Sequence, residues 1–381
     1  MTPNAPKVML CAGSSWYLWN FRRNLVRHFA ASGWQICAVA PEDEWTERLS
    51  ALERTSYVRW PVSLDGAMPL EEAASLRSLA GILRREEPDF VLNHGIKANV
   101  YGGLCCRGRS IPYANVVSGL GMRMSRQGIV ASGLARLYSF ACSGGVALIV
   151  QNTADLEFLR RNGLSPRLPI HQVMGSGVDL AYFRPEGRLD PRGQSFLFVG
   201  RLQRDKGIHD FVAAAALVRK ESPSVRFVVV GDTRHANSGA VSDVELDCWR
   251  REGIVEFVGQ CEDVRPWLAR ATTLVVPSHG GEGMPKVILE ASASGRPVIA
   301  TDVPGCRDAV VPGLNGWLCP PGDPEALAKA MRDVLRMAAA QLEEMGVAAR
   351  KRAEEAFSDD LPARVCLELA EASIGRSSSA T

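Results

Sequence analysis

Two carboxylates lie eight residues apart beside a glycine-rich turn, at Glu282 and Glu290. The apolar run 273–277 predicts a buried parallel strand, residues 278–281 break it, and Pro285 is suited to open a helix. A helix start favours an anionic ligand, because its N–H groups are unpaired and its dipole is positive there. Glu290 could hold vicinal hydroxyls such as those of a ribose. The same spacing also fits a helix cap and a solvated helix face.

Two cations, Arg201 and Lys206, follow another apolar run at 195–199. They can reach one diphosphate from two sides, Arg with a bidentate fork and Lys as a point charge. Such charges suit a diphosphate that becomes more negative as a bond to it breaks. The chain contains no Asp-x-Asp, a pair that often holds a divalent metal, so we expect no metal and no cofactor. A solvated basic loop is the alternative for these two residues taken alone.

A third glycine turn follows the first apolar run, 8–12. Its residues Gly13, Ser14 and Ser15 are small enough to let a ligand approach the backbone, and we expect them to contact the substrate that carries the diphosphate. The turn is not Gly-x-Gly-x-x-Gly, and that pattern occurs nowhere else in the chain. This argues against a dinucleotide-dependent oxidoreductase.

Strand-like runs alternate with helical stretches on both sides of a polar passage at 175–195, which we interpret as a linker. Besides the apolar runs already named, the strand-like runs are 35–39, 89–92, 113–117 and 146–150 before the passage, and 225–230, 254–258, 272–276 and 297–300 after it. Alternation of this kind predicts an α/β chain with two Rossmann-like, doubly wound parallel sheets. We place one domain at 1–187 and a second at 188–360. We expect a last helix at 361–375.

The composition fits two cores, since 381 residues are 46% hydrophobic and 23% charged. Ten cysteines without a Cys-x-x-Cys suggest a reducing cytoplasm, and neither a leader nor a spanning helix is expected. Residues 1–187 hold 20 Lys and Arg against 15 Asp and Glu, a net +5. This half could rest on an anionic membrane surface, although ordinary surface charge explains the count equally well.

The stretch 282–290 resembles the Glu-x7-Glu signature of family-four retaining glycosyltransferases, which have the GT-B fold. Residues 200–207 resemble the loop of that family that grips the diphosphate, and 300–308 resemble the stretch after the acidic motif. The likeness extends to the branch that builds capsules, O-antigens and exopolysaccharides on lipid-linked glycans. It implies that Glu282 contacts the donor sugar and that Glu290 holds the ribose. It also implies that the last helix, 361–375, crosses back to the first domain. Further donor contacts that it implies are Gly231, Asp232, Val258, Gly283, Met284 and Pro285, of which the first three could instead be plain strand-end turns.

Residues 93–102, Asn-His-Gly-Ile-Lys-Ala-Asn-Val-Tyr-Gly, resemble a second stretch of the same branch, with Lys97 among the matching positions. Many members carry a histidine before Gly-Leu-Gly where this chain has Ser118. His94 could replace that histidine, or it could be an ordinary polar residue at a strand end. The residues expected on the acceptor side are Asn20, Arg22, His94, Lys97 and Ser118.

The resemblance implies a metal-independent hexosyltransferase that moves a sugar, an N-acetylhexosamine, from a UDP-sugar to a polyprenyl-diphosphate-linked glycan. Arg201, Lys206 and Glu282 would be its catalytic residues. The expected location is the cytoplasm, peripheral at the inner face of the plasma membrane, with no nucleic-acid partner. Aromatic residues at 16–21 favour a lipid-linked acceptor, but could equally belong to the core. A nucleotide-sugar epimerase and a silent nucleotide-sugar-binding protein on the same fold remain alternatives.

Overall fold

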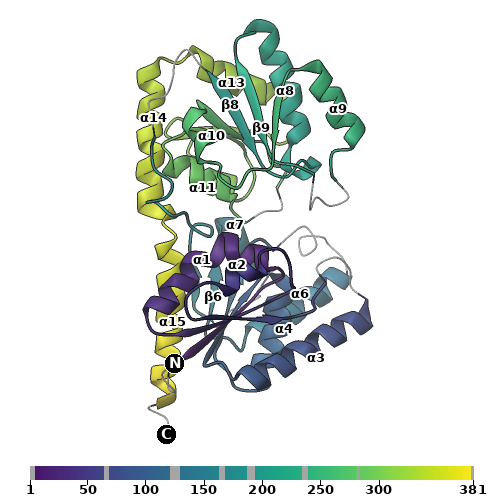
Figure 1. Ribbon diagram of the computed structural model, residues 1–381, viewed down its shortest axis with the longest axis vertical. Coiled ribbons are helices and arrows are strands. Elements are labelled where there is room, and N and C mark those ends of the chain that lie inside the picture. Colours follow the sequence, from purple (N-terminus) through teal and green to yellow (C-terminus); the bar gives the residue numbers. More distant parts are fainter. Residues whose placement is uncertain are drawn as a thin grey trace. The chain divides into compact units, whose positions relative to one another are not determined.

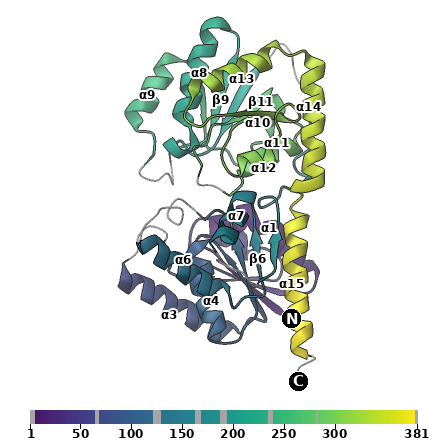
Figure 2. The ribbon, with the colours of Figure 1, turned by 180° about the vertical axis from the view of Figure 1, so that it is seen from behind.

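The computed structural model describes residues 5–63, 68–120, 129–162, 168–186, 194–233, 239–280 and 283–378. The chain divides into two compact units, which Figures 1 and 2 show from opposite sides. The first unit is Met1–Gly177 with Asp359–Thr381, and the second is Val178–Ser358.

A parallel sheet forms the centre of the first unit, with the strand order β3-β2-β1-β4-β5-β6-β7 among the described residues. Its inner strands are short apolar runs buried on both faces, as expected for a parallel sheet covered by helices. The strands are β1 (Lys7–Cys11), β2 (Gln35–Ala40), β3 (Thr55–Arg59), β4 (Phe90–His94), β5 (Tyr113–Val117), β6 (Ala147–Val150) and β7 (Ile170–Gln172).

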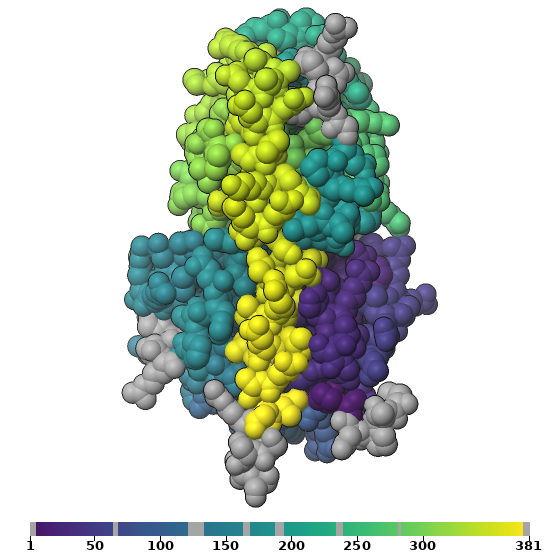
Figure 3. All heavy atoms as spheres, turned by 90° about the vertical axis from the view of Figure 1, so that its left-hand side faces the viewer, coloured from purple at the N-terminus to yellow at the C-terminus, as the bar shows by residue number. Residues whose placement is uncertain are grey.

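Helices cover both faces of this sheet. Alternate residues of β1 show the two layers: Val8 and Leu10 pack with α1 and α15, whereas Met9 and Cys11 pack with α3 and α4. In Figure 3, α15 lies in yellow beside the purple surface of α1. The helices are α1 (Ser15–Ala31), α2 (Thr46–Ser50), α3 (Pro69–Glu86), α4 (Ile96–Arg107), α6 (Ile129–Cys142), α7 (Thr153–Arg161) and α15 (Asp360–Ser378).

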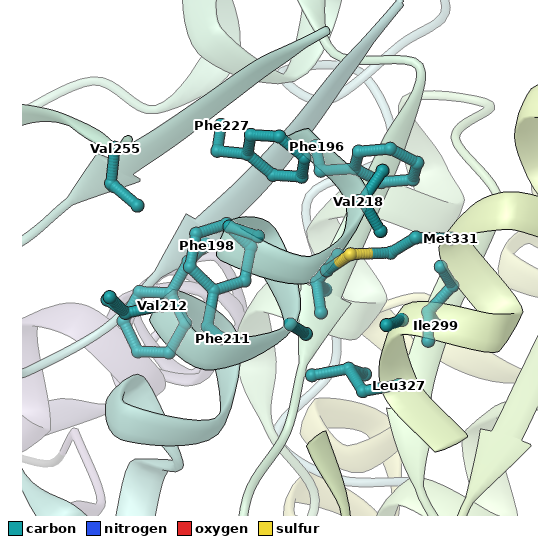
Figure 4. Close-up of a cluster of buried hydrophobic side chains, with 14 of the residues drawn as sticks. Phe196, Phe198, Phe211, Val212, Val218, Phe227, Val255, Ile299, Leu327 and Met331 are labelled. Atoms are coloured by element: carbon teal, nitrogen blue, oxygen red, sulfur yellow. The ribbon is translucent and has the colours of Figure 1, made fainter. Parts of the chain in front are cut away.

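The second unit contains a parallel sheet of strand order β10-β9-β8-β11-β12-β13. Figure 4 shows part of its core, where Phe196 and Phe227 stack at 5.6 Å between ring centroids, and Phe211 from α8 and Met331 from α13 cover the same face. The strands are β8 (Ser195–Val199), β9 (Arg226–Val230), β10 (Glu256–Gly259), β11 (Thr273–Val276), β12 (Val298–Thr301) and β13 (Gly316–Cys319).

The helices of the second unit connect these strands and continue to the end of the unit. They are η1 (Arg204–Lys206), α8 (Ile208–Glu221), α9 (Asp243–Glu252), α10 (Arg265–Arg270), α11 (Lys286–Ala293), α12 (Cys306–Ala309), α13 (Pro324–Arg336), α14 (Ala339–Arg352) and the π-helical turn η2 (Ala353–Phe357).

Each sheet has one point where the strand order reverses. In the first unit it lies between β1 and β4, and in the second between β8 and β11. Ligands of doubly wound sheets bind beyond the carboxyl ends of the strands at such a point. The predicted fold, two doubly wound parallel sheets, is confirmed. A ligand is therefore expected at the loops after β1, β4, β8 and β11.

Candidate active site

The loop after β8 carries the predicted cations. Arg201 is exposed just beyond the strand, and Lys206 ends the short turn η1. Gly207 then leads into α8 with a φ of 73°, a left-handed conformation that favours glycine. A Cβ atom on Gly207 would lie 1.8 Å from the carbonyl oxygen of Pro277. Glycine at this position therefore lets the basic loop approach the backbone that follows β11.

Hydrogen bonds join the same two loops. The carbonyl oxygen of Asp205 accepts from the N–H of His279 at 2.8 Å and from the hydroxyl of Ser278 at 3.3 Å. The ring Nε2 of His279 lies 2.7 Å from Oδ2 of Asp210, in the first turn of α8. The basic loop and the start of the loop toward α11 are thus held together. Glu282 itself lies outside the described residues.

Glu290 lies in the second turn of α11, and its side chain is only 14% exposed. Burial raises the pKa of its carboxyl above the ordinary value, while Lys286, with Nζ 3.9 Å from Oε1, opposes the shift and Asp263 adds to it. The helix begins at Lys286 with Pro285 as its N-cap, one residue later than the sequence predicts. A carboxylate removed from water in this way gains most from hydroxyl donors supplied by a ligand.

The loops after β8, β9 and β10 also meet through their backbones. The N–H of Leu202 donates to the carbonyl oxygen of Asp232 at 2.9 Å, and that of Gly231 donates to Gly259 at 2.8 Å. A Cβ atom on Gly231 would lie 1.9 Å from the carbonyl oxygen of Gly200. These residues therefore form one continuous wall beside the basic loop.

A further close approach fixes the residues before α11. Gly305 has a φ of 84°, and a Cβ atom there would lie 1.9 Å from the carbonyl oxygen of Gly283. Met284 is buried next to this contact, and Val258 is half-buried on β10. Except for Glu282, the structure gathers the predicted residues of the second unit around the carboxyl ends of β8, β9, β10 and β11.

In the first unit, two hydroxyls of the turn after β1 serve the local structure. Ser14 caps α1 by accepting from the N–H of Tyr17 at 3.2 Å. Ser15 is fully buried and donates to the carbonyl oxygen of Pro41 at 3.1 Å. Gly13 precedes the cap and is partly exposed. The turn holds the start of α1 in place, a role that the sequence did not indicate.

Arg22 and His94 come together at the reversal point of the first sheet. Nε of Arg22 donates to Nδ1 of His94 at 3.1 Å, and Nη2 donates to the hydroxyl of Tyr17 at 2.6 Å. Because Nδ1 accepts this bond, the neutral imidazole carries its proton on Nε2. Burial, followed by the charge of Arg22, holds the pKa of His94 well below its usual value. Both side chains line a cavity together with Gln151 and Ser176.

The remaining acceptor-side residues make other contacts. The amide of Asn20 donates to the carbonyl oxygen of Trp16 at 2.9 Å, within α1. Lys97 pairs with Glu72 of α3 at 2.6 Å and donates to the carbonyl oxygen of Ser63. Neither contact brings these two residues to the Arg22–His94 pair.

Ser118 directly follows β5, and the residues after it form a loop that is hydrogen-bonded to Asp155. The buried carboxylate of Asp155 accepts from the N–H of Gly119 at 3.0 Å and from that of Leu120 at 3.1 Å. Asp155 belongs to the first turn of α7, 35 residues from Leu120 in the sequence. Sequence reasoning missed Asp155, because an acidic residue near a helix start is most simply explained as a helix-dipole contact.

The described residues contain neither a candidate metal-binding cluster nor a candidate membrane-spanning helix. No group of three or more His, Cys, Asp and Glu side chains is arranged to hold a metal ion within the described ranges. No described helix has the length and apolar character needed to cross a bilayer.

Two known families match the chain. Residues 18–174 match the glycosyl transferase 4-like domain, and residues 193–337 match glycosyl transferases group 1. The chain is 27% identical over 323 residues to the N,N'-diacetylbacillosaminyl-diphospho-undecaprenol alpha-1,3-N-acetylgalactosaminyltransferase of Campylobacter jejuni. The aligned region covers 80% of this chain and 82% of that protein. It is 27% identical over 275 residues to the UDP-Gal:alpha-D-GlcNAc-diphosphoundecaprenol alpha-1,3-galactosyltransferase of Escherichia coli, covering 69% and 70%.

The fold is similar to that of a solved structure, the sucrose-phosphate synthase of Thermosynechococcus elongatus. The two share a TM-score of 0.81 at 21% identity, over 98% of this chain and 100% of the other. The fold and the two family matches agree on one class of enzyme. The chain is a glycosyltransferase of the GT-B fold class, in which a glycosyl transferase 4-like domain precedes a group 1 glycosyl transferase domain.

Proposed function

We propose that this enzyme transfers a sugar, an N-acetylhexosamine, from a UDP-sugar to a polyprenyl-diphosphate-linked glycan during surface polysaccharide synthesis. The names of the Campylobacter and Escherichia relatives support the acceptor class, and the name of the Escherichia relative supports the donor nucleotide. The observation that carries the proposal is the contact between the basic loop and the loop toward α11 at the reversal point of the second sheet. There, the loop that carries two cations is joined to the loop that leads into α11, and α11 carries the buried carboxylate of Glu290.

In the proposed reaction, Arg201 and Lys206 neutralise the departing diphosphate, and the start of α11 adds its N–H groups. Glu290 accepts hydrogen bonds from the ribose hydroxyls, and Glu282 contacts the donor sugar. The acceptor hydroxyl attacks from the face that the diphosphate leaves, and a diphosphate oxygen takes its proton. The configuration is thereby retained, without a covalent intermediate and without a metal.

The first unit is proposed to bind the acceptor. Arg22 and His94 form the buried centre of this region, and Ser118 lies at the end of a neighbouring strand. Asn20 and Lys97 would contribute through the helices that carry them. The enzyme would work in the cytoplasm, bound peripherally at the inner face of the plasma membrane, where a lipid-linked glycan is anchored.

The test is incubation of the purified protein with a panel of UDP-sugars and lipid-diphosphate acceptors, with and without a chelator. We expect a lipid-linked product from a UDP-N-acetylhexosamine, with the anomeric configuration of the donor and an unchanged rate in the chelator. Epimerisation of the free donor without a lipid-linked product would contradict the proposed transfer. Loss of activity in the chelator and its return with manganese would contradict metal independence.

A further inference from the structure

A long part of the first unit contains no acidic residue. From Phe90 to Ala154 the sequence has no Asp or Glu, although these make up 42 of the 381 residues of the chain. The same stretch contains six basic residues, Lys97, Arg107, Arg109, Arg123, Arg126 and Arg136. It includes β4, α4, β5, α6 and β6. Lys97 pairs with Glu72 of α3, but no acidic residue within the stretch offsets the other five positive charges, so the segment attracts anionic surfaces.

The helix α6 within this stretch has two different faces. Tyr138, Ala141 and Cys142 are buried against the strands β5 and β6. On the other side, Leu134 is 48% exposed, Leu137 is 42% exposed and Phe140 is 54% exposed. These three follow one another at intervals of three residues, so they form one stripe along the helix, which we call the α6 stripe. Apolar residues scattered singly over a surface need no explanation, but three large ones exposed together on one helix form a patch of the kind that marks an interaction site.

One arginine contacts the α6 stripe, and two more are exposed on α6 or just beyond α4. The guanidinium of Arg107, at the end of α4, lies 4.4 Å from the ring centroid of Phe140 and donates to the hydroxyl of Ser143 at 2.9 Å. Arg136 is exposed on α6 itself, and Arg109 is exposed just beyond α4. Apolar side chains bordered by arginines, with no nearby acid along the chain, match the surface of a bilayer that contains anionic lipid.

The aromatic residues at the start of α1 are a weaker candidate for the same role. Trp16 is exposed, but Tyr17 and Trp19 are partly buried and pack against the core of the first unit. The exposed residues Leu314 and Val347 belong to the second unit. Residues 308–322 around Leu314 contain no Lys or Arg, and Val347 lies three residues from Glu344. Apolar exposure and uncompensated positive charge therefore coincide at α6.

We propose that the α6 stripe, with Arg107, Arg109 and Arg136, is the surface by which this enzyme docks on a membrane containing anionic lipid. The apolar side chains enter the boundary between headgroups and acyl chains, and the arginines pair with the lipid phosphates. The inference deepens the proposed function, because an acceptor anchored in a bilayer has to be reached from its surface. Docking itself requires neither donor nor acceptor, so it can be measured separately.

The experiment measures sedimentation of the full chain with vesicles, without any substrate. One set of vesicles contains phosphatidylcholine alone, and the other contains phosphatidylcholine with phosphatidylglycerol. The main variant combines Leu134→Gln, Leu137→Gln and Phe140→Gln. A second variant combines Arg107→Gln with Arg136→Gln. The matched control combines Leu314→Gln with Val347→Gln, which removes exposed apolar side chains from the second unit.

We expect the natural chain to bind the phosphatidylglycerol vesicles and to release them at high salt. The triple variant should bind at least about tenfold more weakly. The double arginine variant should lose roughly 25-fold in affinity and most of its salt dependence, because each basic side chain near the surface contributes about fivefold. The control should bind like the natural chain. The single variant Leu137→Gln, with a smaller loss in the same direction, keeps the test valid if the triple variant does not fold.

Two results would overturn the proposal. One is unchanged vesicle binding by the triple variant, with the far-UV circular dichroism of the natural chain. The other is a stripe that holds two copies together, seen as a sedimentation coefficient that falls in the triple variant while vesicle binding stays the same. Transfer to a short, water-soluble acceptor separates this proposal from the proposed function. The triple variant should keep that activity, and its absence in the natural chain would count against the transferase reaction and not against docking.

Discussion

Gly207 offers the sharpest perturbation of the site, because it sets how close the basic loop comes to the loop after β11. In Gly207→Ala, the new Cβ atom would start 1.8 Å from the carbonyl oxygen of Pro277. Carbon atoms of this kind do not approach other atoms more closely than 3.0 Å, so the two backbones must separate by at least 1.2 Å, the difference between 3.0 and 1.8. Lys206 is the adjacent residue and would move with them.

Gly253 provides a matched control. It has a φ of 63°, close to the 73° of Gly207, but nothing lies within 4 Å of the position of its Cβ atom. Gly253→Ala therefore meets only the cost of a left-handed alanine, about 1 kcal/mol. Gly207→Ala meets that cost and a steric overlap of roughly 1–3 kcal/mol, for a total of about 2–4 kcal/mol. A shift of about 1 Å in the loop should also lower kcat/KM for transfer by roughly 100-fold.

The assays are urea unfolding of both variants and calorimetric titration with UDP, followed by steady-state transfer kinetics. We expect Gly207→Ala to be less stable than Gly253→Ala and to bind UDP more weakly, while Gly253→Ala binds UDP like the natural chain. Equal stability of the two variants with equal UDP affinity would refute the reasoning. It would mean that the approach to Pro277 does not position the basic loop.

Three more substitutions test other parts of the account. Glu290→Gln should weaken UDP binding by roughly tenfold to 100-fold in calorimetry, because charged hydrogen bonds to the ribose are lost. The same variant should be more stable than the natural chain at neutral pH. Because the pKa of Glu290 is raised in the folded state, the folded state binds more protons than the unfolded state, and the free energy of unfolding of the natural chain falls as pH rises from the ordinary glutamate pKa through the raised one. Glutamine does not titrate, so the variant lacks this fall. Urea unfolding across that pH range checks it, and a less stable variant at neutral pH would contradict the burial argument. Arg22→Ala should lower the free energy of unfolding in urea by about 2–4 kcal/mol, because it leaves His94 and Tyr17 without their hydrogen-bond donor. The neighbouring Arg23 is stacked over the Trp19 ring, and Arg23→Ala should lower it by less than about 0.5 kcal/mol. Similar costs for the two arginines would show that the buried bonds of Arg22 contribute little. Asp155→Asn should lower kcat roughly tenfold with unchanged UDP affinity, because the loop at Gly119 and Leu120 loses charged hydrogen bonds, and Glu157→Gln on the same helix is the control. A kcat equal in both variants would remove Asp155 from the positioning of that loop.

The sequence predicted the inner strands of both sheets well, and the strands that it missed lie at the edges. β1, β2, β4, β5 and β6 are apolar runs because helices bury both of their faces. β3, β7 and β13 lie at sheet edges and contain partly exposed residues. Their sequences therefore do not form continuous apolar runs. Periodicity detects burial, so a strand that is only half buried gives a weak signal.

For the site, the sequence indicated residue types but not their partners. The loop that carries Arg201 and Lys206 and the glycine turn before the helix that carries Glu290 were both predicted, and the structure gathers them at one edge of the second sheet. The bond between Arg22 and His94 joins residues 72 apart, and the two bonds of Asp155 reach a loop 35 and 36 residues away. Such pairs depend on strand order, which local patterns do not specify. The ion pair of Lys97 with Glu72 likewise depends on how α3 packs against α4.

The central claim is that two cations of one loop stabilise the departing diphosphate. The most direct measurement is kcat/KM for transfer from the UDP-sugar in Arg201→Ala, in Lys206→Ala and in Arg204→Ala. Arg204 lies between them on the same loop and pairs with Glu245 at 3.6 Å, so it controls for the loss of a positive charge. We predict a fall of roughly 30-fold to 1,000-fold for each of the first two, about 2–4 kcal/mol, and under about threefold for Arg204→Ala. Rates for Arg201→Ala and Lys206→Ala that match that of Arg204→Ala would contradict the claim.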